Sequence, residues 1–173
     1  MWFRKTRTPQ LPEEVASCLR RHEVTSDLQR AVAEETEDGK WLVATKAELL
    51  VANATEMRRV GHWCELQSAT WEAKTRELTV SYLDPQVEPY RVTTRSEDPH
   101  KFMGAVKEGV HHAVVAYRQA ECENGTVVAA SVRRGPEGEI FSAVVAYGPL
   151  DEQGQEAAAA LEAQVREDVG LAP

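Results

Sequence analysis

The His62-Trp63-Cys64 stretch carries the side chains in this sequence that are best suited to chemistry. A thiol beside an imidazole can be activated as a nucleophile, and the same two residues could supply two ligands to zinc. On an extended segment, His62 and Cys64 would share a face and lie roughly 7 Å apart. Catalysis also needs an orienting third group and an oxyanion pocket, and zinc needs further ligands. No second Cys/His pair lies nearby in the sequence, so we predict a structural pair, with Trp63 packing on the opposite face.

Two further interpretations of polar residues stay open beside this one. A pocket near His62 and Cys64 would make the chain a small-molecule binder or an enzyme. The basic pair Arg133-Arg134 could contact a phosphate or a carboxylate, although it precedes a predicted turn, where charge is usually solvated. His62, Cys64, Arg133 and Arg134 are therefore the candidate contacts for a ligand or partner.

The chain lacks the short motifs that mark common catalytic and cofactor sites. GxGxxG, GxxxxGK[ST], GxSxG and DxDxDG are all absent from the sequence. His111 and His112 are adjacent on a predicted helix and diverge by about 100°, so they cannot chelate one ion together. We predict no catalytic, metal-binding or cofactor-binding residue and no cofactor, and we favour a protein that is not an enzyme.

The charge of the chain argues against some classes of partner. It has 173 residues, 20 Lys and Arg against 28 Asp and Glu, and a formal net charge of −8. Proteins that bind nucleic acid gain most of their affinity from positive surface, so we expect no nucleic-acid partner. The basic-aromatic start, with Trp2, Phe3, Arg4 and Lys5, offers a weak alternative of peripheral membrane contact.

Cysteine usage and hydropathy predict a cytoplasmic protein. The chain has three cysteines, at positions 18, 64 and 122, and their spacing matches no CxxC pattern. An odd number of widely spaced cysteines suggests free thiols in a reducing compartment. No apolar run approaches the roughly 20 residues that span a bilayer, and the N-terminus lacks the apolar core of a signal peptide.

Hydrophobic periodicity predicts short strands framed by helices. Val15, Cys18 and Leu19 share one face of a helix over 11–21. Alternating patterns predict strands over 27–35, 40–45, 49–53, 57–63, 66–72, 76–83 and 90–95, and later over 126–132 and 139–147. Leu161 and Val165 belong to a final helix over 156–170.

The segment 96–121 is predicted to be one long helix. Asp98 is a suitable N-cap and Pro99 suits the first helical position. The residues that form its apolar stripe are Phe102, Val106, Val110, Ala113 and Tyr117. Gly104 and Gly109 weaken its intrinsic propensity, so we expect the helix to dock on the sheet.

Seven short antiparallel strands followed by a helix resemble the pleckstrin-homology (PH)-like fold, and residues 27–120 resemble uncharacterised bacterial PH-like domains. The residues that carry this resemblance are WLVATKAELLV (41–51), the hairpin SATWEAKTRELTVSYLD and the helix from Asp98. The resemblance implies an α+β fold: a PH-like antiparallel β-barrel capped by a C-terminal helix, with an added β-hairpin and final helix. The expected organisation is a tail and short helix over 1–26, the PH-like domain over 27–121, and an extension over 122–173 packed on the same domain.

The function expected from these features is a non-enzymatic protein-interaction or scaffolding module. Many PH domains bind phosphoinositides through basic residues in their first loop, but the matching stretch here is EETEDG, whose four acids would repel an anionic headgroup. A protein or peptide partner fits better, because sheet edges accept an added strand. The hairpin is apolar on both faces, with Val128, Ala130 and Val132 on one and Val127 and Ala129 on the other, which predicts a homodimer.

Overall fold

The computed structural model describes residues 10–24 and 28–172, and it divides the chain into two compact units. The first unit is Met1–Val110 and the second is His111–Pro173. Each unit has its own sheets and its own hydrophobic core, so each is described by itself below. The predicted packing of the C-terminal extension on the first domain stays a prediction.

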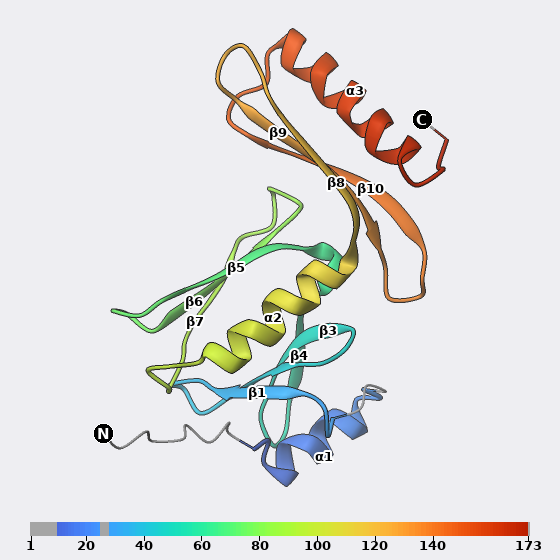
Figure 1. Cartoon of the computed structure of the whole chain (residues 1–173). Coiled ribbons are helices and arrows are strands. Elements are labelled where there is room, and N and C mark those ends of the chain that lie inside the picture. Colours follow the sequence, from blue (N-terminus) through green and yellow to red (C-terminus); the bar gives the residue numbers. More distant parts are fainter. Residues whose placement is uncertain (1–9, 25–27, 173) are drawn as a thin grey trace, which may run out of the picture. The chain divides into compact units, whose positions relative to one another are not determined.

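The first unit contains most of the predicted strands (Figure 1). Its helices are α1 (Glu13–Arg21) and most of α2 (His100–Ala113). Its strands are β1 (Val32–Glu35), β2 (Trp41–Ala44), β3 (Glu48–Ala52), β4 (Met57–His62), β5 (Leu66–Glu72), β6 (Glu77–Tyr82) and β7 (Tyr90–Thr93). The alternation in the sequence therefore located every one of these strands, with differences only at their ends.

The strands of the first unit form two antiparallel sheets, with orders β1-β2-β3-β4 and β5-β6-β7. A short 3-10 turn, Trp63–Glu65, interrupts the chain between β4 and β5. Among the described residues, one isolated bridge between Thr36 and Thr94 links the two sheets. The predicted α+β class and antiparallel pairing are confirmed, but the predicted closed barrel is wrong, because the hydrogen-bonded ladder is not continuous from β4 to β5.

Both faces of the first sheet are buried at its central strands β2 and β3. Val15 and Leu19 of α1 pack on one face, against Val43 of β2 and Leu50 of β3. Leu42 and Leu49 point to the opposite face and are also fully buried, since side chains alternate along each strand. The predicted first helix is confirmed, and its stripe of residues at spacings of three and four forms the contact with the sheet.

The long predicted helix is correct only in its first half. Helix α2 ends at Ala113, and the chain continues as strand β8 (Val114–Glu121). Val114 and Tyr117 suit a strand at least as well as a helix, and this segment pairs with the next strand through a turn that includes Gly125 at φ +80°. Pairing with the next strand therefore overrides the helical spacing here.

The second unit is a three-stranded antiparallel sheet covered on one face by a helix (Figure 1). Its elements are β8, β9 (Val127–Arg134), β10 (Ile140–Tyr147) and α3 (Glu152–Glu167), and the strand order is β10-β9-β8. The added hairpin and final helix are therefore confirmed, but the sheet has a third strand that the sequence analysis assigned to a helix.

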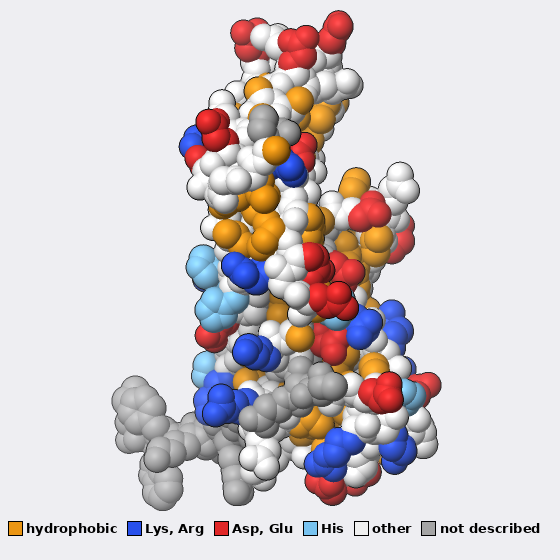
Figure 2. Space-filling model, turned by 90° about the vertical axis from the view of Figure 1, so that its right-hand side faces the viewer, with side chains coloured by type: hydrophobic (Ala, Val, Ile, Leu, Met, Phe, Trp, Pro, Cys, Tyr) orange, Lys and Arg blue, Asp and Glu red, His pale blue; other side chains and the backbone are white. Residues whose placement is uncertain are grey.

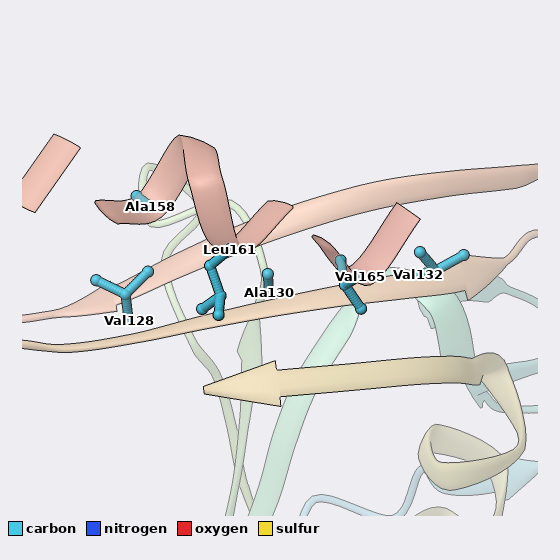
Figure 3. Packing of buried hydrophobic residues seen from close by; sticks show 6 residues of the cluster. All are labelled: Val128, Ala130, Val132, Ala158, Leu161 and Val165. Carbon is cyan, nitrogen blue, oxygen red and sulfur yellow. The ribbon is translucent and has the colours of Figure 1, made fainter. Parts of the chain in front are cut away.

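The core of the second unit lies between β9 and α3. Figure 3 shows Leu161 and Val165 of α3 over the β9 side chains. The six residues of this cluster are Val128, Ala130, Val132, Ala158, Leu161 and Val165. The Asp151 carboxylate caps α3 by accepting a hydrogen bond from the Gly154 N–H at 2.7 Å. One apolar face of the predicted hairpin is thus buried by the C-terminal helix, as expected.

Candidate functional site

The structure places His62 and Cys64 on different elements. Strand β4 ends at His62, and Cys64 belongs to the 3-10 turn that follows. The extended segment that would have aligned the two side chains on one face is therefore not formed. The Cys64 side chain is buried, with 5% of its surface exposed. A buried thiol is a poor nucleophile, because burial in apolar surroundings opposes the thiolate form.

His62 lies instead near an ion pair between Glu48 of the neighbouring strand β3 and Arg59 of its own strand β4. Its Nδ1 is 3.7 Å from Oε2 of Glu48, a distance too long for a hydrogen bond. The same Glu48 oxygen accepts a hydrogen bond from Nε of Arg59. The carboxylate is therefore already neutralised by a guanidinium and is not available as an unpaired orienting base for His62. Among the residues that the structure describes, no group of three or more His, Cys, Asp or Glu side chains is placed to hold a metal ion.

Trp63 is the residue of this stretch with the clearest structural role. Its ring is buried, and its Nε1 donates a hydrogen bond to the Thr45 carbonyl oxygen at 3.1 Å. Its ring also lies against the backbone of α2 at Gly109, where a Cβ would be 2.5 Å from the ring atoms Cδ2 and Cε2. A glycine in the middle of an apolar helical stripe was the available sequence signal for this close contact.

A recess of about 340 Å³ lined by charged side chains lies in the first unit beside β3, β4 and β7. It is lined by Asp38, Lys40, Val51, Ala52, Asn53, Glu56, Met57, Arg58, Tyr90, Arg91 and Val92. Lys40 lies 3.7 Å from Asp38 and 3.9 Å from Glu56, and the Arg58 guanidinium stacks 5.0 Å from the centre of the Tyr90 ring. Burial raises the pKa of Tyr90. The cations here are engaged with acids and an aromatic ring, so the cavity offers an anion no unpaired cluster of positive charge.

The acidic stretch EETEDG, expected to form the first loop, begins within strand β1. Glu34 is on β1 opposite Leu42, and only 2% of its surface is exposed. Desolvation raises the pKa of its carboxyl group above the ordinary value. Glu35 pairs with Arg95, and Glu37 lies 3.1 Å from Arg76. Asp38 pairs with Lys40 at 3.7 Å, so all four acids are buried or paired within the first unit.

The Arg133-Arg134 pair lies at the end of strand β9, not in the turn that follows. Arg133 is 6% exposed, and its Nε donates a hydrogen bond to Oγ of Ser131 at 3.1 Å. Arg134 is exposed to solvent. The alternation of the strand separates the two side chains, so they do not form one bidentate site for phosphate.

The two outer strands of the second unit differ in how their free edges are protected. Natural proteins protect edge strands with charges, prolines or bulges, because open edges pair with other chains. Strand β8 carries Arg118 and Glu121 and has a register shift between Val114 and Ala116. Strand β10, with the sequence IFSAVVAY, has no charge, no proline and an unbroken register of eight pairs with β9. Within the described chain β10 pairs only with β9.

The β10 part of the sheet face opposite α3 is also apolar. The register places Phe141, Ala143 and Val145 of β10 on this face, opposite Arg133, Ser131 and Ala129 of β9. Two tyrosines of the sheet, Tyr117 and Tyr147, are 55% and 56% exposed. Figure 2 shows hydrophobic side chains at the surface of the second unit in that view. The sequence identified the two-sided apolar hairpin, but the contrast between the two edges needed the strand order.

The chain has few detectable similarities to known proteins. No protein-family model matches it, and no curated protein matches it. Among solved structures, it is similar to "The crystal structure of the FERM and C-terminal domain complex of Drosophila Merlin", with a TM-score of 0.38 and 14% sequence identity. The match covers 47% of this chain and 28% of that chain. A likeness this distant does not bear on function.

The membrane alternative concerns residues that the structure does not describe. Trp2, Phe3, Arg4 and Lys5 lie in the range 1–9, outside the described residues. Among the described helices, none has the length and hydropathy needed to cross a bilayer.

Proposed function

We propose that this chain is a non-enzymatic protein-interaction or scaffolding module with a PH-like first unit. The order of seven antiparallel strands followed by α2, and the packing of α2 against Trp63, support the PH-like assignment. The free thiols Cys18 and Cys64, both buried, fit the cytoplasmic location that we propose for it.

The recognition element in this proposal is the outer edge of β10. The observation that carries it is the eight-residue strand Ile140–Tyr147, an edge strand that is regular, uncharged and free of proline. A partner strand added there would gain backbone hydrogen bonds along its length, and apolar side chains on both faces would add contact area. The edge of β8, with Arg118 and Glu121, is protected by charge and is not expected to bind.

The test is a capture experiment from the native cell with matched baits. The wild-type chain is compared with Ala143→Lys, which places a charge on the β10 edge, and with Gln119→Lys. Both positions lie on the sheet face opposite α3, since Ala143 opposes Ser131 and Gln119 opposes Ala129. Partners retained by the wild type and Gln119→Lys but lost from Ala143→Lys would support the proposal. Partners retained equally by all three baits would contradict it.

The alternative of a small-molecule binder or enzyme near His62 and Cys64 stays a prediction. Its distinguishing observation would be modification of Cys64 by a thiol reagent in the folded protein, since the mechanism needs an accessible thiolate.

A further inference from the structure

We propose that the strand received at the β10 edge is β10 of a second copy of this chain, so that two second units form a continuous six-stranded antiparallel sheet. This inference rests on the proposed role of the β10 edge and adds the identity of the partner. The argument uses the strand itself and two charged side chains of α3.

Strand β10 has the pattern of a strand that can pair with itself. A two-fold axis perpendicular to the sheet places two identical strands antiparallel and makes the contact self-complementary. When this axis passes through Ala143, Phe141 of each copy lies opposite Val145 of the other copy. Aromatic and β-branched side chains directly opposite each other stabilise antiparallel pairs, and the strand has no charge that would meet its own copy. Centred on Ala143, the axis pairs residues 140–146 of each copy and supplies about seven backbone hydrogen bonds, within the range of typical interfaces.

Helix α3 leaves this edge accessible within its own unit. Its core residues Leu161 and Val165 pack on the central strand β9 (Figure 3), and Ile140, Val144 and Ala146 of β10 lie partly buried at the margin of the same cluster. Adjacent strands are about 4.8 Å apart, so the β9 strands of the two copies would lie about 14 Å apart. The two α3 helices would then lie on the same face at a similar spacing. Packed helices are usually about 8–10 Å apart, so long side chains would fill the space between these two.

Two charged side chains of α3 project toward that space. The Ser142 hydroxyl of β10 donates a hydrogen bond to Oε1 of Glu162, and Nη1 of Arg166 donates to the same hydroxyl at 3.1 Å. Glu162 and Arg166 are both half-buried and reach β10 from above. Ser142 is one residue from the proposed axis, so the two clusters would lie within about 10 Å of each other.

The two-fold axis makes this arrangement complementary in charge. In each copy Glu162 and Arg166 meet at the same Ser142 hydroxyl, so the axis sets a cluster of one acid and one base opposite an identical cluster. Each copy therefore supplies one acid and one base to a symmetric pair of contacts. A different protein would need to reproduce both charges at the same spacing, whereas a second copy has them already.

The first test measures the mass of the purified chain by light scattering and sedimentation at tens of micromolar. The expected result is a dimer for the wild type and for Gln119→Lys, and a dissociation constant raised roughly tenfold or more for Ala143→Lys. Circular dichroism and thermal unfolding check that each variant is folded. A monomeric wild type refutes the self-pairing. If the capture experiment still loses partners with Ala143→Lys, the β10 edge binds another protein and the proposed function stands without the dimer.

The second test examines the charge contacts between the α3 helices of the two copies. Glu162→Arg and Arg166→Glu each place like charges across the axis, so each variant alone is expected to dimerise more weakly than the wild type. Mixed in equal amounts, they are expected to form a heterodimer, because both cross-axis contacts are then between opposite charges. Failure of the mixture to associate more tightly than either variant overturns the proposed register. Cysteine substitution at Ala143 provides an independent readout, since oxidation should link two copies there but not at Gln119.

Discussion

Alanine substitution at the two glycines of α2 should have opposite effects on stability. Alanine is favoured over glycine inside a helix by about 1 kcal/mol, so helix propensity alone predicts that both changes stabilise. Around Gly104, no atom lies within 4 Å of the position of an added Cβ. Gly104→Ala should therefore raise the free energy of unfolding by about 0.5–1 kcal/mol.

Gly109→Ala meets a different environment. An added Cβ would lie 2.5 Å from two ring atoms of Trp63 and 2.9 Å from a third. The ring is buried and held by its hydrogen bond to Thr45, so it cannot move aside without loss of packing or of that bond. Overpacking a core costs about 1–3 kcal/mol. Three ring contacts under 3.0 Å place this substitution in the upper half of that range, so after the gain in propensity is subtracted we expect a net loss of about 1–2 kcal/mol.

Urea and thermal unfolding followed by circular dichroism measure both variants under the same conditions. The expected difference between them, about 2–3 kcal/mol, corresponds to roughly 6–10 °C in Tm for a chain of this size. In a Trp63→Leu background the difference should shrink, because the flexible side chain leaves room for the Cβ. Equal stabilisation by the two alanines would refute the contact between α2 and Trp63, and with it the packing of α2 on the first unit.

Three other outcomes follow from burial. Glu34→Gln should match the stability of the wild type near pH 4 and exceed it by about 1 kcal/mol at pH 7–8. The reason is that the pKa of the buried Glu34 carboxyl is raised, so the wild type loses stability as the pH rises through that pKa. Urea unfolding measures this, and a variant that is equally or less stable than the wild type at pH 8 contradicts it. Leu161→Ala should lower the free energy of unfolding of the second unit by about 2–4 kcal/mol, and with it the melting temperature, because it leaves a cavity between α3 and β9. Hydrogen exchange of the β9 amides measures this, and unchanged protection of those amides contradicts the proposed core. In the folded chain a thiol reagent should modify the half-buried Cys122 well before the buried Cys18 and Cys64. Mass spectrometry gives the order of labelling, and labelling of Cys18 or Cys64 as fast as Cys122 contradicts this.

Local periodicity located most of the elements. The strands of the first unit appear in the sequence as two-fold alternation bounded by turn residues, and α1 appears as a stripe at spacings of three and four. These patterns arise because one side of each element is buried, so they can be detected in a single sequence. The hairpin β9–β10 and the helix α3 were predicted for the same reason.

The sequence was ambiguous where two patterns coexist. Val110, Ala113 and Tyr117 fit a helical stripe, yet Val114–Glu121 is a strand, because its pairing with β9 supplies hydrogen bonds that the sequence of β8 alone does not indicate. The relative placement of His62 and Cys64 was ambiguous in a similar way. The expected geometry assumed an extended chain, and the 3-10 turn after β4 separates the two residues.

By itself, then, the sequence determined the α+β composition, the positions of the amphipathic elements and the absence of known catalytic motifs. Tertiary structure alone decided that the seven strands make two sheets, that Gly109 is required by the Trp63 ring, and that β10 and β8 are the outer strands of the second sheet. The physical reason is that alternation records which side of a strand is buried, whereas strand order and edge exposure depend on which distant segments pair.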